Sequence, residues 1–92
     1  MRDRESLLFT DHARRRSQQR GKRREALVLI YRHGDLERRA GRGRVAVRLS
    51  RAACAGLLAG GLSKTQVERA ARAELVVSEL DGAVITVLDS EE

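Results

Sequence analysis

The chain has 92 residues, of which 41% are hydrophobic, and its 19 Lys and Arg outnumber its 13 Asp and Glu to give a net charge of +6. This length indicates a single domain over residues 1–92, and its core must be aliphatic because Phe9 and Tyr31 are the only aromatic residues. One cysteine, Cys54, excludes a disulfide framework and a thiolate metal site, and no stretch approaches the ~20 apolar residues that span a membrane.

The first predicted helix is almost entirely polar. It begins at Asp11, with Thr10 or Asp11 as its N-cap, and runs to Arg20, where Gly21 ends it. Ala13 is its only apolar side chain, so the helix has almost nothing to bury. The sequence therefore raises the question of what holds this helix in place and what its polar side chains face.

A core helix, a polar connection and a strand follow. Residues 23–34 are strongly apolar and predict the central core helix, with Ala26, Leu27, Ile30 and Tyr31 at helical spacing. Residues 35–44 form a polar, glycine-bearing connection that suits a β-turn between strands. Residues 44–50 alternate and predict a half-buried strand, with Val45, Val47 and Leu49 on one face and Arg44, Ala46 and Arg48 on a basic outer face.

Two more helices are expected between residues 50 and 72. Ser50 caps the first, which is rich in small residues, contains Cys54 as a core residue, and ends at a pair of glycines. Ser63 and Gln66 form the S-x-x-Q capping box that begins the second.

The end of the chain predicts a β-hairpin. Asp81 and Gly82 form a preferred two-residue turn between runs rich in β-branched residues. With that turn, Val76 shares a face with Ile85 and Val87, and neither face is fully polar, so we expect the hairpin to be internal in the sheet. The expected fold is α+β, an antiparallel sheet of three or four strands with helices packed mainly on one face.

The charges are unevenly distributed along the chain. Residues 1–51 hold sixteen basic and six acidic side chains, whereas residues 52–92 hold three basic and seven acidic ones. A basic half indicates a localised positive surface suited to RNA or another polyanion. The alternative is that these charges belong to solvated faces without a partner.

The first helix carries a stripe that could act on RNA. His12, Arg16 and Arg20 are four residues apart and share one side of the helix. Arginine binds phosphate oxygens bidentately and histidine suits acid–base chemistry near neutral pH. The alternative is that His12 packs or caps the helix and the arginines are solvated.

The same segment resembles a known family. HARRRSQQRG matches the pattern H-A-x-x-R-x-x-x-R-G, and it is similar to the opening of the small bacterial domain-of-unknown-function family 4258. REALVLIYRHGD resembles that family's second helix and VVSELDGAVITVL its closing hairpin, so the likeness covers residues 9–88. Lys22 departs from the pattern, where the family has an aliphatic residue, and predicts weaker packing between the first two helices.

The resemblance implies the fold shared by RelE-like toxins and barnase-like nucleases, and with it an RNA-directed role. Carried over by position, the matching residues are His12, Arg16, Arg20 and Gly21, together with Thr86 on the last strand. In an alternative role, His12 and Arg16 tie the first helix to the sheet.

A second basic cluster surrounds the predicted strand. It comprises Arg38, Arg39, Arg42, Arg44 and Arg48, of which we expect the last three to bind phosphate. His33 suits the dipole at the end of its helix. The helices predicted between residues 55 and 72 also resemble the start of a helix-turn-helix unit, but a strand-like segment follows where a recognition helix is needed.

The leading hypothesis is a cytoplasmic, RNA-binding toxin-type ribonuclease that uses no cofactor or metal. In it His12 and Arg16 are catalytic, and Arg20, Arg42, Arg44 and Arg48 hold nucleic acid. One alternative is a non-catalytic module that binds an antitoxin, another acidic protein or a second copy of the chain. Another is a small DNA-binding protein.

Overall fold

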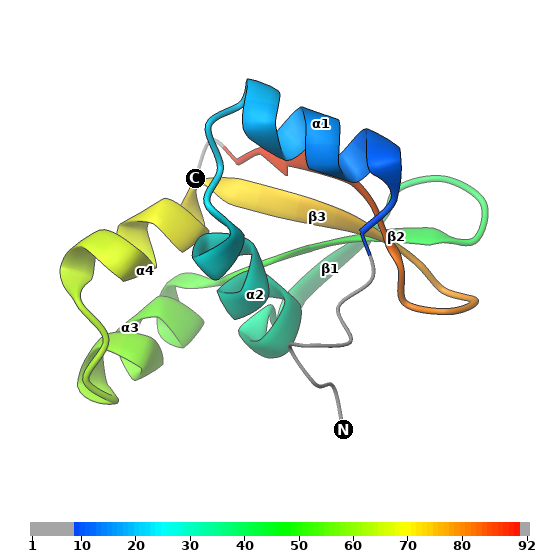
Figure 1. The fold of residues 1–92 in the computed structure, drawn as a ribbon. Helices are drawn as coiled ribbons and strands as arrows, with labels where there is room; N and C mark the ends of the chain where they lie inside the picture. The colour runs from blue at the N-terminus through cyan, green and yellow to red at the C-terminus, as the bar shows by residue number, and fades with distance from the viewer. Residues whose placement is uncertain (1–8, 91–92) are drawn as a thin grey trace.

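The computed structural model describes residues 9–90. Helices and strands follow one another in the order α1 (Asp11–Gln19), α2 (Arg24–His33), β1 (Leu36–Arg39), β2 (Arg44–Arg48), α3 (Arg51–Ala59), α4 (Lys64–Ala71), β3 (Ala73–Ser78) and β4 (Val84–Asp89). The four strands form one antiparallel sheet in the order β1-β2-β3-β4 (Figure 1). The predicted α+β class, with helices mainly on one face of an antiparallel sheet, is confirmed.

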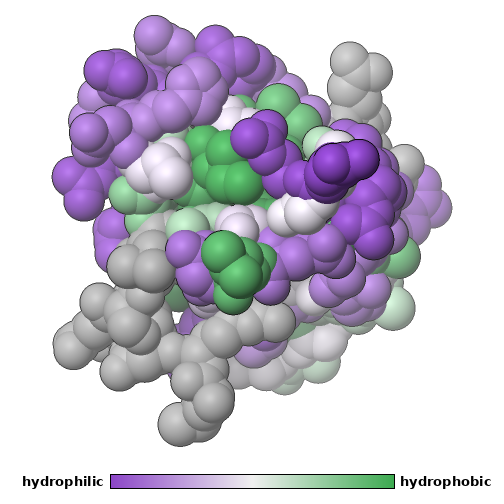
Figure 2. All heavy atoms as spheres, turned by 90° about the vertical axis from the view of Figure 1, so that its right-hand side faces the viewer, coloured by the Kyte–Doolittle hydropathy of each residue, from purple (hydrophilic) through white to green (hydrophobic). Residues whose placement is uncertain are grey.

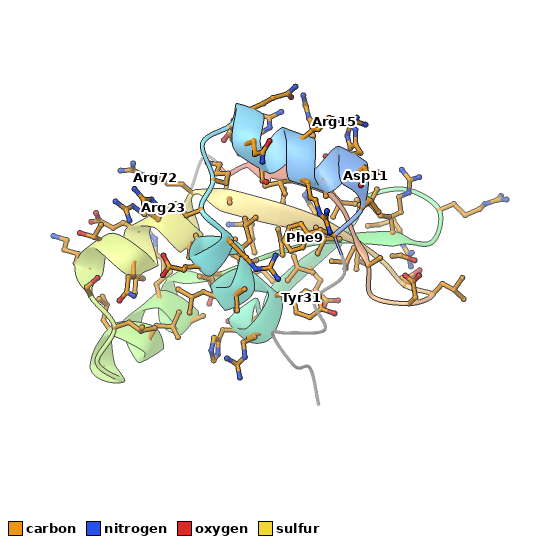
Figure 3. The ribbon with its side chains drawn as sticks, in the orientation of Figure 1. Phe9, Asp11, Arg15, Arg23, Tyr31 and Arg72 are labelled. Carbon is orange, nitrogen blue, oxygen red and sulfur yellow. The ribbon has the colours of Figure 1, made fainter. Side chains whose placement is uncertain are left out.

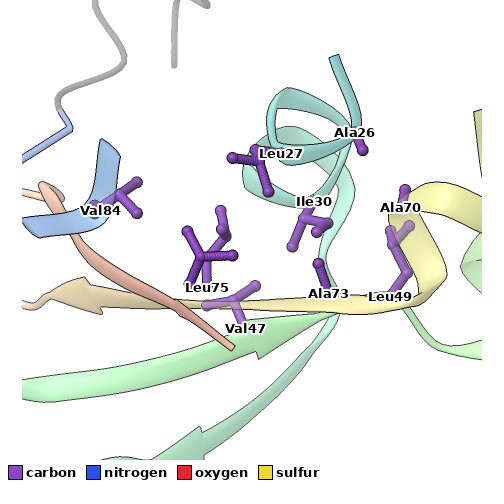
Figure 4. Packing of buried hydrophobic residues seen from close by; sticks show 11 residues of the cluster. Ala26, Leu27, Ile30, Val47, Leu49, Ala70, Ala73, Leu75 and Val84 are labelled. Atoms are coloured by element: carbon purple, nitrogen blue, oxygen red, sulfur yellow. The ribbon is translucent and has the colours of Figure 1, made fainter. Parts of the chain in front are cut away.

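The core lies between the sheet and helix α2. Val47, Leu75 and Val87 form one row across β2, β3 and β4, and Leu27 and Ile30 of α2 pack over this face of the sheet (Figure 4). Full burial of an aliphatic side chain of this size stabilises the fold by about 1.5–3 kcal/mol. An aliphatic core is therefore sufficient to position the helices.

The helix starts follow the predicted capping chemistry. The side chain of Thr10 caps α1, that of Ser50 caps α3, and Ser63 and Gln66 form the capping box of α4. Each side chain satisfies a backbone N–H that the first turn of a helix leaves without a partner. Of the four helices, α3 is the least covered and packs mainly on α4.

The hairpin exists, but the predicted register is wrong. Its loop has four residues, 79–82, and is closed by a hydrogen bond from Ser78 N to Ala83 O of 2.9 Å. Side chains favour this wider loop: Ser78 Oγ accepts from Leu80 N, and Asp81 Oδ1 accepts from Ala83 N. A bulge beside Val76 shifts the pairing further, so Val76 lies opposite Thr86 and not Val87.

The hairpin is also not fully internal, because β4 is an edge strand of the sheet. Its start is covered by residues before α1: Phe9 forms an isolated parallel bridge with Val84. This bridge occupies part of the free edge of β4.

Strand β2 departs from its predicted half-buried pattern. Ala46, expected on a basic outer face, is fully buried. The adjoining β1, formed by part of the polar connection, pairs along β2 and contributes Arg38 opposite Ala46. Ala46 lies between Arg38 of β1 and the buried Val76 of β3, and these larger neighbours can shield so small a side chain.

The end of the molecule that carries the β1–β2 and β3–β4 turns is mainly hydrophilic, with some hydrophobic residues between the polar ones (Figure 2). Leu80, in the β3–β4 loop, is 93% exposed. Among residues 9–90, no helix has the length and apolarity that crossing a bilayer demands.

Candidate nucleic-acid interface

Helix α1 is held mainly by its first turn. Thr10 N donates to Val84 O and Thr10 Oγ1 to Ile85 O, both at 3.1 Å, and the same Oγ1 accepts from Ala13 N. Ala13 is fully buried in the core. Because backbone hydrogen bonds and one alanine dock the helix on β4, most of its charged side chains are left on the outside.

The predicted stripe occupies this outer side only in part. His12 is exposed, whereas Arg16 and Arg20 are half-buried. Arg16 Nη1 donates weakly to Gln19 Oε1 at 3.4 Å, and within the described residues the buried Nε of Arg16 has no hydrogen-bond partner. Arg15 points outward from α1 (Figure 3).

Arg20 and Lys22 share one carboxylate. Arg20 Nη1 lies 2.6 Å from Asp89 Oδ2, and Lys22 Nζ lies 2.9 Å from Asp89 Oδ1. Hydrogen bonding and charge from Lys22, and then from Arg20, lower the pKa of Asp89 despite some desolvation. Lys22 Nζ also donates to Arg72 O at 3.1 Å, so the residue that was expected to weaken this corner instead joins it to β4 and α4.

A cationic cavity opens beside this contact. It has a volume of about 230 Å³ and is lined by Gly21, Ala26 and five cationic side chains: Arg20, Lys22, Arg23, Arg69 and Arg72. We call it the corner cavity. Arg23, before α2, and Arg72, after α4, lie side by side (Figure 3). Within residues 9–90 no side chain caps the N-terminus of α2, and the N–H groups of its first turn add to the positive potential.

A groove between α2 and α4 continues from the corner cavity. Its volume is about 330 Å³, and Arg23, Ala26 and Arg69 line both spaces. Apolar side chains, Val28 and Leu29 of α2 and Leu62 before α4, form part of its wall. We call it the α2–α4 groove.

The edges of the α2–α4 groove carry more positive charge. Arg24 and Arg32 line it as well, against one acidic residue, Glu25. The Arg24 guanidinium lies 5.4 Å from the centroid of the Phe9 ring, a cation–π distance that orients this side chain.

Three of these cations have no internal counter-charge in the described part of the chain. Arg23, Arg69 and Arg72 form no ion pair with a residue between 9 and 90. Like charges gathered around one cavity repel each other, and an anion bound between them would relieve that repulsion. The arrangement is therefore suited to phosphate.

The remaining predicted residues lie on the other face of the sheet. Arg48 and Thr86 alternate with Val47 and Val87, which face the helices, so their side chains point to the opposite face. Arg44, at the start of β2, shares that face, and Arg42 lies exposed in the β1–β2 turn. The fold thus does not bring Thr86 together with His12 and Arg16.

Carboxylates neutralise part of this second cluster. Arg38 forms two hydrogen bonds to the buried Glu74, at 3.1 and 2.8 Å, and Arg39 Nη1 lies 2.8 Å from Glu79. The positive potential of this cluster is therefore weaker than the number of its arginines predicts.

Arg23, Arg69 and Arg72 were not predicted as site residues from the sequence. Arg69 and Arg72 are two of only three basic residues after residue 51, so the charge balance of that half concealed them. Their spacing of three residues, at the end of a helix with a clear capping box, was an available signal that they share a face.

Two other kinds of site, a metal site and a reactive thiol, can be compared with the described residues. No three His, Cys, Asp or Glu side chains between residues 9 and 90 gather where they could hold a metal ion. Cys54, expected in the core, is only half-buried against it, because α3 buries none of its residues. Desolvation, and then the charge of Asp35, raises the pKa of its thiol, which disfavours the reactive thiolate.

Comparison with known proteins identifies no family: no family model matches the chain, and neither a curated protein nor a solved structure matches it. The resemblance to the domain-of-unknown-function family therefore stays a prediction, and the function has to be argued from the geometry.

Proposed function

We propose that this domain binds single-stranded RNA along the α2–α4 groove and the corner cavity. The observation that carries the proposal is the convergence of Arg23, Arg69 and Arg72 on one cavity without an ion-pair partner among the described residues. Contacts between basic side chains and phosphates supply most of the affinity of sequence-independent binding.

The apolar wall of the groove favours a single strand over a duplex. A space of about 330 Å³ next to Val28, Leu29 and Leu62 suits an unstacked base, which a single strand can offer and a duplex cannot. The groove arginines can stack on such a base through their planar guanidinium groups. A helix-turn-helix mode on DNA is disfavoured because α4 is followed by strand β3.

Salt-dependent binding tests this proposal. A labelled RNA of about twelve nucleotides would be titrated with the protein by fluorescence anisotropy at several salt concentrations. We expect Arg69→Gln with Arg72→Gln to weaken binding and to reduce the slope of log affinity against log salt by about 1.4, because each phosphate contact to a single strand contributes about 0.7.

The matched control removes two arginines from the other face. Arg42→Gln with Arg44→Gln changes the net charge equally, and both residues are exposed, so we expect a smaller loss. A larger loss in this control would move the interface to the open face of the sheet. A protein that binds no RNA but dimerises in dilute solution would support the interaction-module alternative.

Cleavage of the bound RNA is a separable hypothesis. It rests on the exposed His12, with Arg16 one turn later on α1, since a histidine can transfer protons and an arginine can stabilise the phosphate. We expect His12→Ala to abolish cleavage in the absence of added metal while it leaves binding intact. RNA that remains whole with both proteins would reject the ribonuclease and leave the binding function.

A further inference from the structure

The α2–α4 groove and the corner cavity differ in chemistry. The groove combines an apolar wall with arginines spread along its length, whereas the corner cavity concentrates five cationic side chains around about 230 Å³. An RNA backbone carries one charge per phosphate at regular intervals. A backbone alone therefore does not call for such a concentration of positive charge at one end.

A terminal phosphate fits this concentration better. A phosphomonoester carries a charge of about −1.5 to −2 at neutral pH and three strong acceptor oxygens, compared with a single charge on a phosphodiester. Guanidinium groups bind such oxygens through paired donors, and Arg23, Arg69 and Arg72 approach the cavity from two separate elements. Donors from different directions match a group whose oxygens point in three directions.

Asp89 positions two of the five cations. It holds Arg20 at 2.6 Å and Lys22 at 2.9 Å, and the Lys22 side chain is only 13% exposed. These side chains therefore lose little further conformational freedom when an anion arrives. One carboxylate balances only part of the charge of five cations, so the corner cavity keeps an excess of positive charge.

We propose that the domain takes RNA by a phosphorylated end, with the terminal phosphate in the corner cavity and the adjoining base against the apolar wall of the α2–α4 groove. The inference rests on the proposed RNA binding and specifies which part of the strand is bound. The shared residues Arg23 and Arg69 lie where the phosphate and its own nucleoside would meet.

Three RNAs of one sequence test the proposal on the unmodified protein. They carry a 5′-phosphate, a 3′-phosphate or hydroxyl groups at both ends, with the fluorophore attached internally, and their affinities are compared at one moderate salt concentration. We expect one phosphorylated form to bind at least about tenfold more tightly than the hydroxyl form, and the preferred form identifies which end is recognised. Equal affinity for all three would overturn end recognition and leave RNA binding in place, whereas no binding of any would reject RNA binding itself.

Variants then locate the preference. Arg23→Gln with Arg72→Gln should reduce the ratio between phosphorylated and hydroxyl RNA to near one, while Arg42→Gln with Arg44→Gln should leave the ratio unchanged. Circular dichroism spectra that match the parent protein would show that both variants are folded. A ratio that survives in the first variant and falls in the second would place the end on the other face of the sheet and overturn the assignment.

Discussion

At the scale of single residues, Asp89 is the carboxylate on which the corner between α1 and α2 depends. It accepts from Lys22 and Arg20, and these contacts lower its pKa. A carboxyl group with a lowered pKa binds its proton less tightly in the folded than in the unfolded chain. It therefore stabilises the fold above its ordinary pKa of about 3.9 and loses that contribution as the pH falls through its lower folded value.

We expect Asp89→Asn to lower the urea midpoint of unfolding at pH 7, because both cations lose their partner. The difference from the parent protein should be smaller at pH 3, which lies below the ordinary pKa of about 3.9, because part of the contribution of Asp89 is lost there. Urea unfolding at both pH values, followed by circular dichroism, measures this. Glu68→Gln is a suitable control because, among residues 9–90, the only ion pair of Glu68 is with Lys64, at 4.0 Å. A difference as large in that control would contradict the role given to Asp89.

Asp35 also has a lowered pKa, and it lies at the start of α3 rather than near Asp89. Ser50 donates to it through its hydroxyl at 2.6 Å and its backbone N–H at 2.8 Å, and these bonds lower the pKa of Asp35. Ser50 Oγ in turn accepts from Ala53 N at the start of α3. The same carboxylate is present in the parent and in Asp89→Asn, so its titration cancels in their comparison.

At the scale of elements, Gly34 fixes the close approach of α2 to β2. A Cβ at this position would lie 2.4 Å from Val47 Cγ1 and 2.6 Å from Ile30 O. The φ angle of Gly34 is −59°, so its requirement for glycine is steric and does not come from the backbone conformation. A side chain there would force the central helix away from the sheet.

Paired alanine substitutions test this requirement. We expect Gly34→Ala to destabilise the domain by about 1–3 kcal/mol, the usual cost of overpacking. Gly56→Ala, in helix α3 with no atom within 4 Å of the added Cβ, should stabilise it by about 0.5–1 kcal/mol. Chemical unfolding measures the free energy of unfolding of both variants. An unchanged free energy of unfolding in Gly34→Ala would mean that α2 can shift away from the sheet without a loss of stability.

Elements with local signals were predictable from the sequence, and those set by long-range contacts were not. Helix α1 begins after Thr10 and ends before Gly21 as expected, because capping depends on adjacent residues. The hairpin register depends on two side-chain hydrogen bonds and a bulge, which the Asp81–Gly82 signal does not reveal. The pairing of Phe9 with Val84 at the edge of β4 joins residues that are 75 positions apart along the chain.

At the scale of the whole molecule, the candidate site is a product of the fold. Arg69 and Arg72 meet Arg20, Lys22 and Arg23 only because α4 packs beside α2. A count of charges along the chain assigns these residues to opposite halves, one basic and one acidic. The proposed binding of a polyanion could thus be predicted from composition, whereas the location of the corner cavity could not.

The excess positive charge also predicts that anions stabilise the domain. A ligand that binds only the folded state at one hundred times its Kd stabilises that state by about 2.7 kcal/mol. For a domain of this size each kcal/mol raises Tm by about 4–8 °C, so saturating RNA should raise Tm by roughly 10 °C or more. Thermal unfolding with and without the RNA measures the shift.

The unfolded chain keeps all its arginines and also attracts RNA, which reduces the shift. The two double variants separate RNA binding to the folded chain from RNA binding to the unfolded chain. Both remove the same charge from the unfolded chain; one is Arg69→Gln with Arg72→Gln, and the other is Arg42→Gln with Arg44→Gln. A smaller Tm shift in the first variant than in the second can therefore come only from the folded arrangement around the corner cavity. Equal Tm shifts in both variants would mean that RNA binding depends on net charge alone and that the corner cavity is not the binding site.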